Sequence, residues 1–274
     1  MSASLSTTSE IPAGYRPPPA LLKDRVILVT GATGGLGQAA ALWAAKLGAT
    51  VVLLGRKVAA LEALYDRIEA QGGAQPVIHP LDLLTAKWSD YGTLAVNLSE
   101  NFGHLDGIVH AAAHFQAFTP LRQLPPREWL ESLQVNLTAP YALTKQCLPL
   151  LDKSSDASVV FIADSATEAP RAYSGAYGVT KLAQRGLAGI WAEELGYKPH
   201  LRFNCYAPPP MRTALRRRGY PQEDPATLSS AEDAVEPILW LLGPDSRGHN
   251  GERFTNAGAG NDGPAASSRA STSP

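Results

Sequence analysis

Short, uninterrupted apolar runs alternate along the chain with segments in which apolar residues recur at helical spacing. Runs without polar alternation are typical of strands buried on both faces of a parallel sheet. They predict strands at residues 26–29, 50–55, 76–80, 105–110, 158–163, 201–206 and 252–255. Helical spacing and composition predict helices at 38–47, 58–70, 94–102, 129–151, 177–194 and 232–242, with Pro140 kinking the fourth. This alternation favours right-handed crossovers and one α/β domain.

A glycine-rich turn between the first predicted strand and helix carries the main functional signal. Gly31, Gly35 and Gly37 follow Thr30 in the spacing Thr-Gly-x-x-x-Gly-x-Gly. Glycines admit a pyrophosphate close to the backbone, where the N–H groups and the helix dipole attract an anion. The motif therefore predicts a dinucleotide site in a doubly wound, Rossmann-type fold, with a mostly parallel sheet of about seven strands flanked by helices.

Two cations follow the second predicted strand, where such a fold places its ligand. NAD-binding folds usually keep an acidic residue here to bond the ribose 2′-hydroxyl. Arg56 and Lys57 instead favour the 2′-phosphate of NADP, although a solvated pair at the strand end is the alternative. Asp82, beyond the third strand, accepts from the adenine amino group or caps a helix that starts at Leu83.

Composition and the chain ends set further limits. A net charge of −1 gives no reason to expect nucleic acid or an anionic membrane as a partner. Two cysteines without ligand spacing, no secretory signal pattern and no long apolar run favour the cytoplasm. The polar, proline-rich residues 1–20 predict a flexible arm, and 258–274 predict a disordered tail. The domain is expected to span 21–257, with a lid at about 209–226.

Taken together with further motifs, these features resemble the short-chain dehydrogenase/reductase family over residues 20–255, and the chain is similar to the bacterial YciK-type branch. The glycine motif, Asn136, Tyr177-x-x-x-Lys181, and Pro208 with Thr213 carry the resemblance. It implies NADP(H) bound by the main-chain turn and nearby side chains. The implied cofactor residues are Gly31, Thr33, Gly35, Leu36, Gly37, Arg56, Lys57, Asp82, Leu83, Ala111, Ala112, Tyr177, Lys181, Pro208 and Thr213.

The resemblance also implies hydride transfer between nicotinamide and the carbonyl or alcohol carbon of a small molecule. Tyr177 would be the acid/base, and Lys181, four residues on and on the same helix face, would stabilise its ionised form. Asn136 would hold a water that relays protons from Lys181. In this family the helices of Tyr177 and Asn136 usually pair between subunits, which implies a homodimer or homotetramer.

Three departures from the family pattern stand near the expected catalytic centre. Asp164 occupies the position of the usual serine donor, and an ionised carboxylate there would oppose tyrosinate formation. Ser165 replaces that serine only if the strand end is bulged or has become loop. Ala111 to Ala113 replace the family's Asn-Ala-Gly, and Pro209 replaces a glycine in the nicotinamide loop.

Two polar clusters in the same regions have more than one interpretation. His110 and His114 alone do not predict a metal site, because no carboxylate or cysteine stands at ligand spacing from them. Residues 216–218, three arginines in the lid, either recognise an acidic substrate or form a solvated helix face.

Two functions therefore remain open. The first is an NADP(H)-dependent carbonyl reductase or alcohol dehydrogenase, in which Ser165 or a protonated Asp164 supplies the missing donor. The second is an NADP(H)-binding sensor or scaffold with little or no catalysis. The substrate is not given by the sequence, since the residues that would contact it lie in loops.

Overall fold

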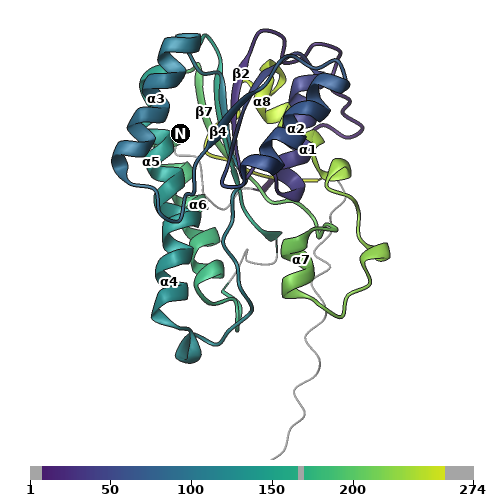
Figure 1. Cartoon of the computed structure of the whole chain (residues 1–274), viewed down its shortest axis with the longest axis vertical. Helices are drawn as coiled ribbons and strands as arrows, with labels where there is room; N and C mark the ends of the chain where they lie inside the picture. The colour runs from purple at the N-terminus through teal and green to yellow at the C-terminus, as the bar shows by residue number, and fades with distance from the viewer. Residues whose placement is uncertain (1–7, 166–169, 257–274) are drawn as a thin grey trace, which may run out of the picture.

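Eight parallel strands form one twisted sheet in the computed structural model, which describes residues 8–165 and 170–256 (Figure 1). Across the sheet the strands run in the order β1-β8-β7-β6-β5-β2-β3-β4. Their bounds are β1 Thr8–Glu10, β2 Val26–Thr30, β3 Thr50–Gly55, β4 Val77–Pro80, β5 Gly107–His110, β6 Ala157–Ile162, β7 Leu201–Tyr206 and β8 Arg253–Thr255. The seven predicted strands and the doubly wound α/β fold are confirmed.

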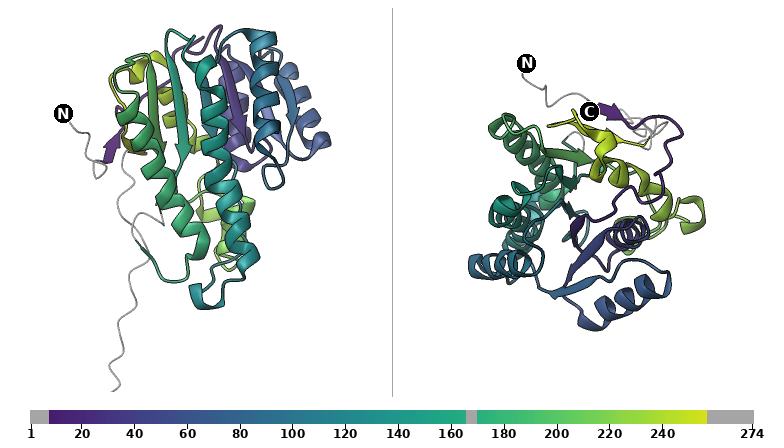
Figure 2. Two further views of the ribbon diagram at one scale, coloured as in Figure 1. Left: turned by 90° about the vertical axis from the view of Figure 1, so that its left-hand side faces the viewer. Right: turned by 90° about the horizontal axis from the view of Figure 1, so that it is seen from above.

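Helices cover both faces of the sheet (Figures 1 and 2). One face carries α1 Gly35–Lys46, α2 Val58–Ala70 and α8 Glu236–Leu242, and the other carries α3 Trp88–Phe102, α5 Ala139–Leu151 and α6 Gly175–Glu194. Strand β2 shows why its residues are continuously apolar. Ile27 and Val29 pack toward α1, whereas Val26 and Leu28 pack into the opposite core. None of the helices in the described ranges is long and apolar enough to cross a membrane.

Strand order reverses beside β2, and this reversal positions the site. The chain runs from β2 outward through β3 and β4, and then returns so that β5 pairs with the other edge of β2. The crevice beyond the carboxyl ends of β2 and β5 is where doubly wound folds bind their ligands. The remaining helices, α4 Pro126–Leu133 and α7 Ala214–Gly219, lie beyond this end of the sheet (Figure 1).

The N-terminal segment is not a flexible arm where the structure describes it. Thr8–Glu10 forms β1 and pairs in parallel with β8, and Ile11 is buried. Tyr15 Oη then donates to Asp245 at 2.8 Å, and Arg16 pairs with Glu236 at 2.6 Å. The interpretation of residues 1–20 as flexible is therefore wrong for residues 8–20, while residues 1–7 and the predicted tail at 258–274 lie outside the described ranges.

Two helices differ most from their predicted forms. Helix α3 begins at Trp88 rather than Leu94, because the Asp90 side chain accepts from the Lys87 N–H at 2.8 Å and so stabilises an earlier start. The predicted helix at 129–151 consists of α4, a π-helical turn at Gln134–Thr138, and α5. The interruption of this helix is therefore the π-helical turn, which lies before the predicted kink at Pro140.

Candidate active site

A cavity of about 560 Å³ opens at the strand-order reversal. Every residue that the sequence analysis assigned to the cofactor lines it, from the glycine turn to Thr213. Asp164 and Ser165 line it as well, and Asn136 lies buried behind its wall. One cavity therefore joins the predicted nucleotide-binding turn to the predicted catalytic pair.

The glycine turn brings two backbone segments closer than side chains would allow. Gly31 has a φ of +64°, and a Cβ there would lie 2.7 Å from Ala112 Cα. A Cβ at Gly37 would overlap the carbonyl oxygen of Gly31. Helix α1 then begins at Gly35 without a side-chain cap. A ligand anion can therefore approach the main chain and take the place of a cap at the helix N-terminus.

Exposed and half-buried polar groups follow β3 and β4 beside the glycine turn. Arg56 and Lys57 are exposed at the end of β3 and line the cavity. Asp82 Oδ1 accepts from the Leu84 N–H at 3.1 Å, so it caps a tight turn and starts no helix. The interpretation of Asp82 as the cap of a helix that starts at Leu83 is therefore wrong. Asp82 also lines the cavity.

At the other end, Tyr177 donates its hydroxyl proton to Asp164. The Tyr177 Oη to Asp164 Oδ2 distance is 2.6 Å, and Tyr177 is buried. Burial raises the pKa of Tyr177 well above its ordinary value, and the Asp164 carboxylate raises it further. Asp164 thus lies against Tyr177, where an ionised carboxylate would oppose the ionisation of the phenol.

Lys181 lies one turn further along α6 and is also buried. Its Nζ donates to the carbonyl of Ile162 at 2.6 Å and to Gln184 Oε1 at 3.2 Å, and it lies 5.8 Å from the centre of the Tyr177 ring. Burial lowers the pKa of Lys181 to about 8, against the opposing effect of the Asp164 charge. The buried lysine thus releases its proton more readily than an exposed one.

Gln184 connects Lys181 to Asn136, a link that the sequence analysis missed. Because Pro140 has no N–H, it cannot bond the carbonyl of Asn136 four residues before it. Gln184 Nε2 donates to that carbonyl at 2.5 Å, while its Oε1 accepts from Lys181. An amide side chain therefore stands between the lysine and the carbonyl. Two signals could have revealed it, a proline four residues after Asn136 and a glutamine three residues after Lys181.

The side chain of Asn136 holds the loop that follows β5. Its Oδ1 accepts from the His114 N–H at 2.6 Å, and its Nδ2 donates to the His114 carbonyl at 2.9 Å and to Thr180 at 3.0 Å. Asn136 therefore acts on the cavity wall through the His114 peptide.

The lid is fastened by the arginines that follow Thr213. Arg216 forms two bonds of 2.7 Å with Glu223 and lies 3.6 Å from the centre of the Tyr220 ring. Arg218 donates to the Phe115 carbonyl at 2.7 Å, and the Phe115 ring lies 4.9 Å from that of Tyr177. Arg216 and Arg218 thus hold α7 over an aromatic wall, a role that neither sequence interpretation foresaw.

The two histidines after β5 have separate surroundings. His110 is fully buried, bonds Thr144 at 2.9 Å, and has its pKa lowered to about 3 by burial. His114 lines the cavity and faces two carboxylates, Glu128 and Glu131 of α4. These carboxylates do not stand at ligand spacing from His114 along the sequence, and the fold brings them to it by placing α4 against the loop.

Comparison with known proteins identifies relatives of this chain. Residues 25–224 match the family model of short chain dehydrogenases. The chain is 40% identical to the uncharacterized oxidoreductase YciK of Escherichia coli K12 over 240 residues, which cover 88% of this chain and 94% of that protein.

Solved structures agree with this similarity. A short chain dehydrogenase structure from Pseudomonas syringae has a TM-score of 0.87 at 42% identity and covers 90% of this chain and 99% of its own. Another, from Escherichia coli CFT073 in complex with NADPH, has a TM-score of 0.83 at 41% identity and covers 86% and 98%. A third, from Shigella flexneri in complex with NADP, has a TM-score of 0.83 at 40% identity and covers 86% and 98%.

Proposed function

The chain belongs to the short-chain dehydrogenase family, and from this premise we propose that it is an NADP(H)-dependent oxidoreductase acting on a small carbonyl compound or alcohol. The observation that carries the proposal is the single cavity, which joins the glycine turn to Tyr177 and Lys181. The cofactor would supply or accept the hydride. All other chemistry falls to the side chains of this chain.

The turn residues fit the proposed cofactor. Gly31 and Gly37 leave a cradle that a Cβ would fill, and the uncapped start of α1 favours an anion. Arg56 and Lys57 supply positive charge where the adenosine 2′-phosphate of NADP(H) would bind. Relatives crystallised with NADP and NADPH support the same cofactor preference.

In the reduction direction Tyr177 would donate a proton to the substrate oxygen. Because the Tyr177 hydroxyl donates to Asp164, the substrate oxygen would have to take the place of that carboxylate as acceptor. Lys181 would stabilise the resulting tyrosinate through its charge. A protonated Asp164 would donate to the substrate oxygen, as Ser165 would if its hydroxyl turns toward the cavity that it lines.

The bond between Tyr177 and Asp164 also favours a second candidate function. If Asp164 stays ionised, it both holds the tyrosine proton and repels a developing oxyanion. The protein would then bind NADP(H) and act as a sensor or scaffold, with little turnover.

The deciding experiment follows NADPH oxidation at 340 nm with a panel of ketones, diketones and quinones. Wild type, Asp164→Ser and Tyr177→Phe are compared, and NADPH binding is measured by fluorescence in each. For the oxidoreductase we expect wild-type turnover that falls about 1000-fold in Tyr177→Phe, as removal of an acid/base group predicts. NADPH binding without wild-type turnover, with activity gained in Asp164→Ser, would establish the binding protein instead.

We also propose that the protein is a homo-oligomer paired through α5 and α6. Val179 and Ile190 are apolar residues on α6 that are 40% and 56% exposed. A second copy of the same helix face would cover them.

A further inference from the structure

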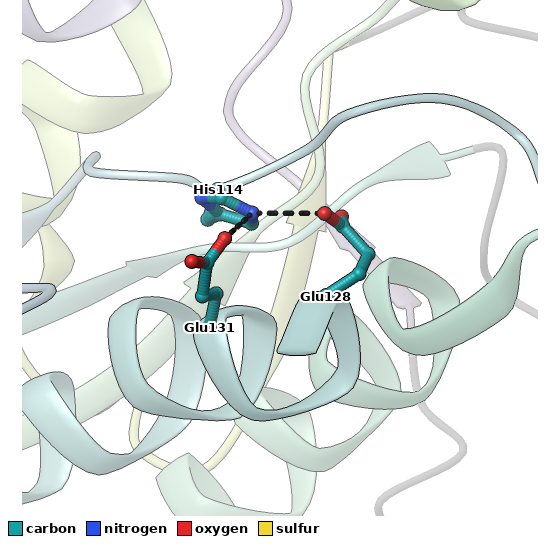
Figure 3. A group of neighbouring side chains, drawn as sticks. All are labelled: His114, Glu128 and Glu131. Carbon is teal, nitrogen blue, oxygen red and sulfur yellow. Dashed lines mark hydrogen bonds and ion pairs between the residues drawn. The ribbon is translucent and has the colours of Figure 1, made fainter. Parts of the chain in front are cut away.

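Three side chains of types that can bind a metal ion gather beside the cavity, and one of them, His114, lines it (Figure 3). His114 comes from the loop after β5, while Glu128 and Glu131 stand one turn apart on α4. Their ligand atoms all lie within 4.8 Å of one another. The three side chains are only 15–17% exposed, so the group is largely withdrawn from solvent.

His114 Nε2 forms a hydrogen bond with Glu128 Oε2, but the distances in this group are long for bonds between charged groups and would also suit a cation. His114 Nε2 lies 3.3 Å from Glu128 Oε2 and 3.4 Å from Glu131 Oε2. Charge-assisted N–H···O bonds are shorter, about 2.7–2.9 Å, and one ring nitrogen carries only one proton to donate. Around a tetrahedral zinc ion with bonds of about 2.1 Å, neighbouring ligands stand about 3.4 Å apart.

Neighbouring groups hold the backbone of His114 and the side chain of Glu131 in place. The Asn136 side chain bonds both the N–H and the carbonyl of His114. Arg127 donates to the outer oxygen of Glu131, Oε1, at 2.6 Å, while the inner oxygen, Oε2, faces His114. Outer partners of this kind orient the ligands of protein metal sites.

The charges also favour a cation between the three groups. Two carboxylates held together away from solvent repel each other, and a divalent ion relieves this repulsion.

We propose that His114 Nε2, Glu128 Oε2 and Glu131 Oε2 bind one divalent transition-metal ion of the zinc type. One nitrogen and two carboxylate oxygens are ligands that zinc accepts, and a further position would remain for water. Because His114 lines the cavity and its peptide is held by Asn136, the bound ion would fix α4 to the wall of the substrate pocket. The proposal does not depend on turnover or on NADP(H) binding.

The test measures metal binding to the full chain without a histidine tag and without nucleotide. The metal-free protein is titrated with Zn²⁺ by calorimetry, and with Co²⁺, whose visible absorption reports on coordination. The variants are His114→Asn and Glu128→Gln. His249→Asn is the matched control, because His249 also pairs with a glutamate, Glu252, at 3.0 Å.

We expect one Zn²⁺ per wild-type chain, a tetrahedral Co²⁺ spectrum, and binding at least about 10-fold weaker in both site variants. His249→Asn should bind as wild type does. Equal binding by wild type and His114→Asn, or loss of binding in the control, would overturn the proposal. Circular dichroism and thermal unfolding without metal check the fold, and Glu128→Gln decides the question if His114→Asn is misfolded.

Discussion

The two ends of the cavity are built in different ways. The nucleotide end is built mainly from main-chain atoms. Gly31 and Gly37 stand where a Cβ would collide with the backbone of Ala112 and of Gly31, respectively. The catalytic end is a set of side chains in which Asp164 follows β6, while Tyr177 and Lys181 are buried one turn apart on α6. The first end depends on space for the backbone, and the second depends on charges that shift one another's protonation.

This difference determines which substitutions each end of the cavity can accept. A main-chain cradle fails when a Cβ is added, so its residues have few alternatives. A side-chain network can change partners while the fold remains. Here Asp164 bonds the tyrosine, and Gln184 stands between Lys181 and Asn136.

The largest expected effect comes from adding a methyl group at the nucleotide end. In Gly37→Ala the Cβ overlaps the Gly31 carbonyl, so we expect a loss of about 3 kcal/mol or more in the free energy of unfolding. Denaturant unfolding measures that loss, and NADPH affinity should fall with it. Gly92→Ala is the control, since a Cβ at Gly92 in α3 meets nothing within 4 Å. Equal stability of the two variants would contradict the cradle.

A smaller effect is expected from removing charge beside the cradle. In the double variant Arg56→Ala with Lys57→Ala, NADPH affinity should fall by about 2 kcal/mol, or roughly 30-fold, because charge-assisted bonds to phosphate are lost. NADH affinity should change little, and both affinities are measured by fluorescence titration. Arg67→Ala, an exposed cation of α2 outside the cavity, serves as the control. An equal loss for the two nucleotides would rule out recognition of the 2′-phosphate.

The smallest effect concerns the protonation of Lys181 at the catalytic end. Its pKa is about 8 when folded and near the ordinary 10.5 when unfolded. At a pH between these two pKa values the unfolded chain binds more protons than the folded chain. The contribution of Lys181 to the free energy of unfolding therefore rises with pH. From pH 8 to pH 9, wild type should gain about 1 kcal/mol relative to Lys181→Met in urea unfolding.

The control for this pH effect is a lysine whose pKa moves the other way. The hydrogen bond to Asp152 raises the pKa of Lys198. Lys198→Met should therefore show no such gain of wild type over the variant from pH 8 to pH 9. A flat difference between wild type and Lys181→Met over the same range would show that burial does not lower the lysine pKa.

Most of the fold could be predicted because burial leaves a local pattern. Residues Val26–Val29 are apolar without interruption since both faces of β2 are covered. Strand β1 escaped prediction because Thr8-Ser9-Glu10 is polar and gains its pairing from β8, far along the chain. The start of α3 was missed because it depends on a single capping contact at Asp90.

The site was predictable to the extent that it consists of motifs with fixed spacing. The glycine turn, Tyr177 with Lys181, and Asp164 thirteen residues before Tyr177 are such features, and all line one cavity. Gln184, Glu128 and Glu131 depend instead on which helices pack together. Their roles come from contacts with Asn136 and His114, which the spacing along the chain does not encode.

The pairing of β1 with β8 has a consequence for the order of folding. Ser9 bonds Glu252 across 243 positions of sequence, so this contact closes one of the longest loops in the described chain. Long-range closure costs more entropy than local pairing and is expected late. During synthesis β1 emerges first yet waits for nearly the whole chain before it can pair. The N-terminal strand should therefore join the sheet after β2, β3 and β5 have assembled, as the step that completes the domain.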